Sequence, residues 1–182
     1  MRRALDFIYR LAGGLAALFI AGIVALVFAQ VGLNLADKIS AALTGHAIGM
    51  TIPSYSDFTG FFLAASTFLA LAYTLREGGH IRVTLLFGRL PEKGQRIAEI
   101  AVVALALAMT GFAAWYMGLL VYESWEFDDR SPGMVSVPLW MPQVPVVVGL
   151  CILALALADE LLALLRGRPA AWEGKGENLL SE

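Results

Sequence analysis

Residues 11–36 read LAGGLAALFIAGIVALVFAQVGLNLA and contain no charged side chain over 26 consecutive positions. An α-helix needs about 20 predominantly apolar residues to cross the hydrocarbon core of a bilayer. A charge at the centre of such a helix costs about 2.5–3.5 kcal/mol even on insertion scales, which explains why the stretch lacks one. The apolar run is longer than the roughly 7–15 residues of a signal-peptide core, and no Ala-x-Ala site ends it. We therefore expect a retained membrane-spanning helix here.

Three further stretches share this absence of charge: residues 58–75, 100–122 and 131–158. The composition of the whole chain is also typical of a membrane protein. Apolar residues make up 59% of it and charged residues 15%, whereas soluble domains carry about 25% charged residues. Apolar runs of this length favour helices, because the strands of a membrane barrel show segments of roughly ten alternating residues. The predicted fold is therefore all-α, an integral membrane protein with four transmembrane helices. The expected helices cover about residues 7–36, 57–76, 97–123 and 139–165.

Basic residues set the expected orientation, because loops that stay in the cytoplasm are enriched in Lys and Arg. Eleven basic residues flank the expected helices on one side of the membrane, and only Lys38 and Arg130 lie on the other. Both termini are therefore predicted to be cytoplasmic, with residues 1–168 forming the transmembrane domain and residues 169–182 a polar cytoplasmic tail. The eleven are Arg2, Arg3, Arg10, Arg76, Arg82, Arg89, Lys93, Arg96, Arg166, Arg168 and Lys175.

The expected inner loop between the second and third helices has a pattern of its own. Gly78 and Gly79 suit the left-handed turn that commonly ends a helix. After them, aliphatic and aromatic side chains are interspersed with Arg82 and Arg89. This pattern predicts a short segment lying in the membrane interface, with its arginines on anionic headgroups or on a partner subunit.

A stripe of small residues follows the first expected helix at every fourth position. In membranes, helix association depends on close packing rather than on the hydrophobic effect, and small residues at this spacing let two backbones approach. The stripe predicts a packing seam, and either another helix of this chain or a partner protein would fit it. Its members are Gly13, Ala17, Ala21, Ala25 and Ala29.

Few side chains in the expected spans are suited to binding or transferring anything. Asp159 and Glu160 lie one to two turns from the inner end of the fourth helix, and we expect an interfacial pair neutralised by bases such as Arg166. His46 and His80 fall in opposite loops, so no pair of helices can clamp a haem between histidines. We therefore expect no catalytic, substrate-binding, metal or cofactor site in this chain, and no enzyme activity.

Two other classes of function remain alternatives. The membrane anchor of a respiratory enzyme would need histidines within the membrane, and the expected spans lack them. A stand-alone four-helix exporter would need a carboxylate at mid-membrane depth, and the first three spans contain none. Cys151 is the only cysteine, which excludes an intrachain disulfide and a cysteine-based metal cluster.

Three segments of the chain resemble one known family. Residues 75–86 read LREGGHIRVTLL, residues 137–143 read VPLWMPQ, and Ala29-Gln30-Val31 lies late in the first expected helix. Together with the number, length and orientation of the helices, they resemble the small membrane subunit (Q component) of tripartite ATP-independent periplasmic (TRAP) transporters, over roughly residues 7–165. The residues that carry the resemblance are Gly78, His80, Arg82, Val83, Pro138, Trp140 and Pro142.

The resemblance implies a sodium-driven symporter of three parts in the bacterial inner membrane. A soluble periplasmic protein captures an organic acid, typically a C4-dicarboxylate, sialic acid or another carboxylate. A large multi-helix membrane subunit carries the substrate and sodium sites. The small subunit, which this chain resembles, pairs with the large one as a scaffold. The implied partners are therefore the large subunit, the periplasmic substrate-binding protein and the lipid bilayer, with no nucleic acid and no cofactor.

Acidic residues gather in the expected outer loop before the fourth helix. Solvated loops of a protein that keeps its positive charge inside would carry such residues without further function. A docking surface for the periplasmic protein would carry them as well, because charged rims steer transient association. Both interpretations apply to Glu123, Glu126, Asp128 and Asp129.

Overall fold

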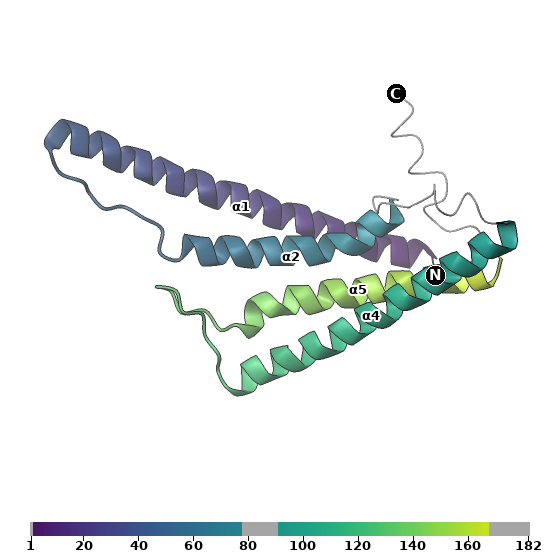
Figure 1. Cartoon of the computed structure of the whole chain (residues 1–182). Coiled ribbons are helices and arrows are strands. Elements are labelled where there is room, and N and C mark those ends of the chain that lie inside the picture. The colour runs from purple at the N-terminus through teal and green to yellow at the C-terminus, as the bar shows by residue number, and fades with distance from the viewer. Residues whose placement is uncertain (1, 78–90, 168–182) are drawn as a thin grey trace, which may run out of the picture.

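The computed structural model describes residues 2–77 and 91–167, which form four α-helices (Figure 1). All four helices are long and apolar enough to cross a membrane. Within the described ranges, the only extended pairing is an isolated bridge between Arg130 and Pro138. The predicted all-α fold with four membrane-length helices is confirmed, whereas the side on which each terminus lies stays a prediction. The helices are α1 (Arg2–Thr44), α2 (Tyr55–Arg76), α4 (Glu92–Glu126) and α5 (Trp140–Leu165).

Two helices extend past the limits that charged residues suggested. α1 continues through Asp37 and Lys38 to Thr44, and α4 covers Glu92–Glu126 rather than 97–123. A charge costs little once a helix has left the hydrocarbon, so nothing forces the helix to end there. At about 1.5 Å per residue, the 43 residues of α1 extend about 65 Å, roughly twice the thickness of the hydrocarbon core. α1 must therefore be tilted or project beyond the bilayer.

Over most of their length the helices lie side by side in the order α1, α2, α5, α4, and near its start α1 also contacts α5 (Figure 1). α1 and α2 make one antiparallel hairpin, α4 and α5 make the other, and α2 packs against α5 where the hairpins meet. α2 and α5 therefore lie inside the layer, and α1 and α4 form its edges. In the most apolar 18-residue window of each helix, 28% and 39% of residues are buried in α2 and α5, against 11% and 6% in α1 and α4.

Glycines set the closest helix contacts. A Cβ added at Gly149 of α5 would lie 2.5 Å from the backbone carbonyl of Phe68 in α2, so these two helices touch backbone to backbone. A Cβ at Gly22 of α1 would lie 3.1 Å from the ring of Phe62, which also meets Phe19 with ring centroids 5.4 Å apart. Direct packing at glycines thus joins the two hairpins through α2 and α5 and closes the α1–α2 hairpin, as expected where small residues drive helix association.

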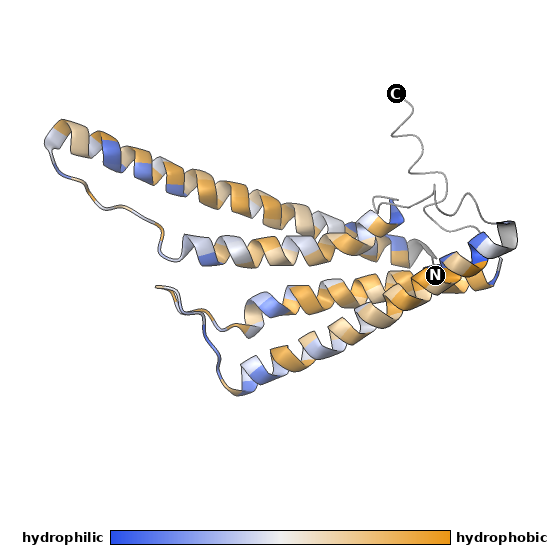
Figure 2. Ribbon diagram, in the orientation of Figure 1, coloured by the Kyte–Doolittle hydropathy of each residue, from blue (hydrophilic) through white to orange (hydrophobic). Residues whose placement is uncertain are grey.

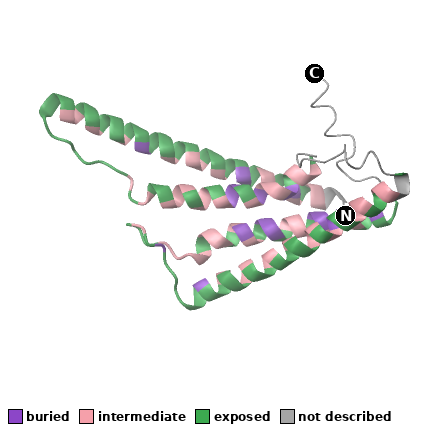
Figure 3. Ribbon diagram, in the orientation of Figure 1, coloured by how far each residue is buried: buried purple, intermediate pink, exposed green. Residues whose placement is uncertain are grey.

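Most of the apolar surface of the helices is not covered by the chain itself. Apolar residues predominate along all four helices (Figure 2), yet the exposed class extends over most of α1 and α4 (Figure 3). Leu18 and Phe28 on α1 are 67% and 73% exposed, and Phe112 and Trp115 on α4 are 66% and 68% exposed. Lipid or partner protein must cover these faces, because soluble proteins rarely expose so continuous an apolar surface to water.

Candidate functional site

A buried arginine joins three helices at the end of the layer where α1 begins. This end, which the sequence predicts to be cytoplasmic, is called the inner end below. Arg76, in the last turn of α2, forms an ion pair with Asp6 of α1. Its Nη1 also lies 3.2 Å from Oδ2 of Asp159 and 3.4 Å from Oε1 of Glu160, both on α5. These four residues are called the Arg76 cluster.

Burial differs sharply among the members of the Arg76 cluster. The side chain of Arg76 is 14% exposed and that of Glu160 only 2%, whereas Asp159 and Asp6 are 24% and 43% exposed. The Arg76–Glu160 contact is therefore the most buried part of the cluster, and Asp6 is its most exposed member. An arginine can hold several carboxylates at once because its guanidinium presents five N–H donors in a fixed fork.

Tyr9 of α1 completes the packing around this arginine. The guanidinium carbon of Arg76 lies 5.3 Å from the centre of the Tyr9 ring, a cation–π distance. Tyr9 is 1% exposed and packs with Ala72 of α2 and Ala156 of α5. Its hydroxyl is buried and has no hydrogen-bond partner among the described residues. The same three helices thus meet through one apolar cluster and one charged cluster.

The acidic pair on α5 is neutralised as expected, by a base from another helix. Asp159 and Glu160 were expected to be neutralised by bases such as Arg166, whereas Arg76 from α2 meets them. Arg166 is exposed just after α5 ends. A second inner arginine does act at that helix end, since Nη2 of Arg96 donates to the carbonyl of Leu164 at 3.0 Å. The same carbonyl also accepts the backbone N–H of Gly167 at 3.0 Å, so Arg96 adds a second donor at the end of α5.

Polar residues of α1 hold the loop that joins it to α2 at the opposite, outer end. Gln30 is 5% exposed, and its Oε1 accepts the backbone N–H of Ile52 at 2.8 Å. The Asp37 carboxylate accepts the N–H groups of Ile48 and Gly49 at 2.6 and 2.7 Å. α1 itself ends at Thr44, and Gly45 after it has a φ of +74°, the left-handed geometry that glycine supplies at helix ends.

The loop between α4 and α5 folds back onto the first turn of α2. The N–H of Val135 donates to Oγ of Ser54 at 2.9 Å, and Gly133 lies so close to Asp57 that a Cβ would meet its carboxylate oxygen. Oδ2 of Asp57 and Oε1 of Gln143 are buried here without a partner among the described residues. The two outer loops are therefore fixed to the helices rather than free.

The residues of the family resemblance fall into two groups. Trp140 opens α5 and packs edge-on against Trp125 of α4, with ring centroids 4.9 Å apart. Pro138 pairs with Arg130 just before that helix, and Pro142 occupies its first turn, where a missing N–H costs little. Gly78, His80, Arg82 and Val83, together with the predicted interfacial segment and polar tail, lie outside the described residues.

The small-residue seam of α1 mostly faces away from the rest of the chain. Gly13 contacts Tyr73 of α2, but the other four members are exposed, and α1 instead packs inward through Tyr9, Ala12 and Ala16. The acidic residues of the outer loop are likewise exposed, with Asp128 bound to Arg130 at 3.1 Å. The exposed residues are Ala17, Ala21, Ala25, Ala29, Glu123, Glu126, Asp128 and Asp129.

The Arg76 cluster and Arg96 join neighbouring helices. Among the described residues, no group of three or more His, Cys, Asp or Glu side chains is placed to hold a metal ion.

A model of the family "Tripartite ATP-independent periplasmic transporters, DctQ component" matches residues 39–167, more than two thirds of the chain. No curated protein and no solved structure matches the sequence.

Proposed function

Because the chain belongs to the family of DctQ components of tripartite ATP-independent periplasmic transporters, we propose that it is the scaffold that holds the large membrane subunit. The family match carries this proposal, and the layered architecture supports it. Four helices in one layer leave both edges and both faces open to contact, which a self-contained bundle would not. The charged residues of the described helices lie near the helix ends, so a substrate would find no charged site at mid-depth.

The transport reaction we propose is the sodium-coupled import of an organic acid across the bacterial inner membrane. In this scheme a periplasmic binding protein delivers the substrate, and the large subunit carries the substrate and sodium sites. The chain contributes a fixed frame, because the Arg76 cluster ties α1, α2 and α5 together and Arg96 ties α4 to α5. A rigid frame lets the moving part of a transporter work against a fixed reference.

We propose that the exposed seam of α1 is the contact with the large subunit. Its alanines project away from α2 and permit a backbone approach that large side chains would block. Replacing both Ala17 and Ala21 by Leu should leave the chain folded, because neither residue is buried within it, and should reduce co-purification of the large subunit. The matched control replaces Ala101 and Ala108 on α4 by Leu, two exposed alanines on the other edge. Loss of the partner with the α4 variant alone would assign the contact to the opposite edge.

The exposed acidic loop is proposed as the docking surface for the periplasmic protein. Charges at the rim of a transient interface act mainly on the association rate, and salt screens them. Reversing Glu126, Asp128 and Asp129 to Lys should slow capture of the loaded binding protein, most strongly at low ionic strength, while the membrane complex still assembles. Equal uptake rates at every salt concentration, with the variant at parental levels in the membrane, would show that these residues serve solvation only.

A further inference from the structure

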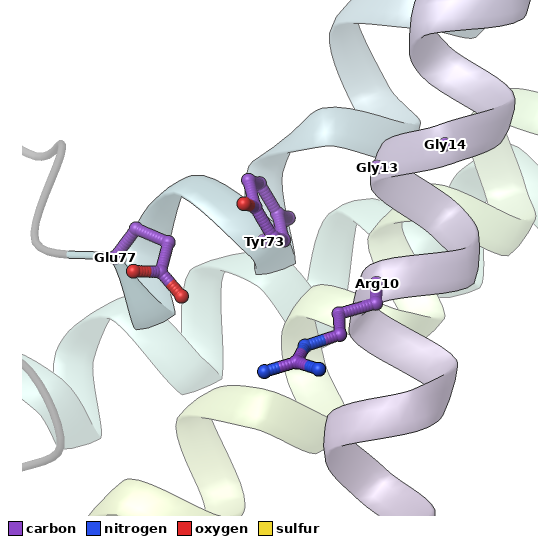
Figure 4. Close-up of a pocket in the computed structure, with 5 residues that line it drawn as sticks. All are labelled: Arg10, Gly13, Gly14, Tyr73 and Glu77. Atoms are coloured by element: carbon purple, nitrogen blue, oxygen red, sulfur yellow. The ribbon is translucent and has the colours of Figure 1, made fainter.

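A surface hollow of about 420 Å³ lies on the α1–α2 hairpin at the inner end (Figure 4). It shares no lining residue with the Arg76 cluster, which faces α5. The lining combines one cation, one anion, one phenol and bare backbone. Its five residues are Arg10, Gly13, Gly14, Tyr73 and Glu77.

Two consecutive glycines line the hollow with bare backbone. A Cβ at Gly13 would lie 2.9 Å from Cγ of Tyr73, so the helices approach closely at that point. A Cβ at Gly14 would have nothing within 4 Å, so the backbone there borders open space. A side chain at Gly14 has room beside the lining residues.

The two charges of the lining lie on opposite sides of the hollow. Figure 4 shows the side chain of Arg10 on α1 and that of Glu77, just after α2, extending toward each other, with Tyr73 above the space between them. Both charged residues are exposed, and no ion pair joins them to each other. A ligand that carries a negative and a positive group a few bonds apart would match this separation of charge.

We propose that this hollow binds the phosphoethanolamine headgroup of a membrane phospholipid, with the phosphate on Arg10 and the ammonium on Glu77. Arginine binds phosphate through paired N–H donors, and a carboxylate has enough lone pairs to accept an ammonium in addition to its other contacts. A purely anionic headgroup would be repelled by Glu77, and a choline headgroup has no N–H to donate to it.

The position of the hollow favours a lipid as the source of this group. Arg10 is the last charged residue before the uncharged run of residues 11–36. Gly13 and Gly14 lie about one turn deeper, so a headgroup held by Arg10 would direct its acyl chains along the glycines into the hydrocarbon. Tyr73 on the adjacent helix is half-exposed at the same depth, where tyrosine commonly marks the membrane interface.

Native mass spectrometry of the purified full-length chain tests the proposal by comparing bound phosphatidylethanolamine, phosphatidylcholine and phosphatidylglycerol. We expect phosphatidylethanolamine to bind most tightly, and Arg10→Gln to weaken it about tenfold, the size expected for losing a charge-assisted hydrogen bond. Glu77→Gln should abolish the preference over the other two lipids. Gly14→Leu should block binding by filling the hollow. The matched controls, Arg166→Gln and Gly32→Leu, change an exposed arginine and an open α1 glycine elsewhere and should bind as the parent does.

Equal binding of the three lipids by the parent, or equal retention by Arg10→Gln and Arg166→Gln, would overturn the proposal. Soluble phosphoethanolamine provides a further arm, because it carries the same headgroup chemistry without acyl chains. Binding of the soluble compound as tight as that of the lipid would overturn the assignment to a membrane lipid. All of these measurements are made without transport, so their outcome is independent of the function proposed above.

Discussion

Replacing Arg76 by Met removes the charge that joins α1, α2 and α5 while keeping an unbranched side chain of similar length. Glu160 would then lose its Arg76 contact at a site where its side chain is only 2% exposed. Breaking a buried ion pair from one side typically costs about 3–5 kcal/mol, because the remaining charge stays desolvated. The contacts to Asp159 and Asp6 add less, since those side chains are 24% and 43% exposed and exposed pairs contribute about 0–1 kcal/mol each.

We expect Arg76→Met to lower the free energy of unfolding by about 3 kcal/mol, the lower end of that range because Glu160 has further contacts. The measurement is unfolding by sodium dodecyl sulfate in mixed micelles, followed by circular dichroism. Arg166→Met is the matched control: Arg166 is exposed, and a surface substitution changes stability by about 0.5 kcal/mol or less.

A second variant distinguishes the cost of leaving a buried charge unpaired from the cost of losing side-chain packing. Adding Glu160→Gln to Arg76→Met removes the desolvated carboxylate charge and should recover part of the lost stability, because neutralising both partners is less costly than breaking the pair. Equal stability of Arg76→Met and Arg166→Met would show that the Arg76 cluster does not hold the hairpins together.

Two other predictions follow from packing and from charge. Gly149→Ala should destabilise the chain by about 1–3 kcal/mol in the same unfolding assay, because the new methyl group would strike the α2 backbone, whereas Gly111→Ala has open space and should not destabilise it, since Ala is the better helix former. In a Cys151→Ala background, a cysteine at Asp128 should react with an impermeant reagent added outside intact cells and one at Lys93 should not. Labelling of the cysteine at Lys93 from outside would contradict the predicted topology.

The number of helices could be predicted from the sequence because a membrane imposes one strong local rule. A charge is costly inside the hydrocarbon, so the uncharged runs mark the spans without any knowledge of tertiary structure. The same rule fails where a helix leaves the bilayer. Asp37 and Lys38 end the uncharged run of α1, yet the helix continues to Thr44. The Asp37 carboxylate accepts hydrogen bonds from two backbone N–H groups of the loop that follows.

The Arg76 cluster could not be predicted, because it depends on which helices are neighbours. Arg76 was counted among the residues that mark the cytoplasmic side, and no local pattern indicates that α2 would place it against Asp159 and Glu160. The small-residue seam illustrates the same limit. Its spacing predicts close packing, but α1 uses Ala12 and Ala16 on another face for its contacts within the chain. Spacing identifies a face that can pack, and only the fold identifies which face does.

Uptake into liposomes tests most directly whether this chain is a scaffold or a transporter in its own right. The chain alone, the large subunit alone and the two together are reconstituted, each with the loaded periplasmic binding protein and an inward sodium gradient. We expect organic-acid uptake only when both membrane subunits are present, and none by the chain alone. Robust sodium-dependent uptake by the chain alone would contradict the scaffold assignment.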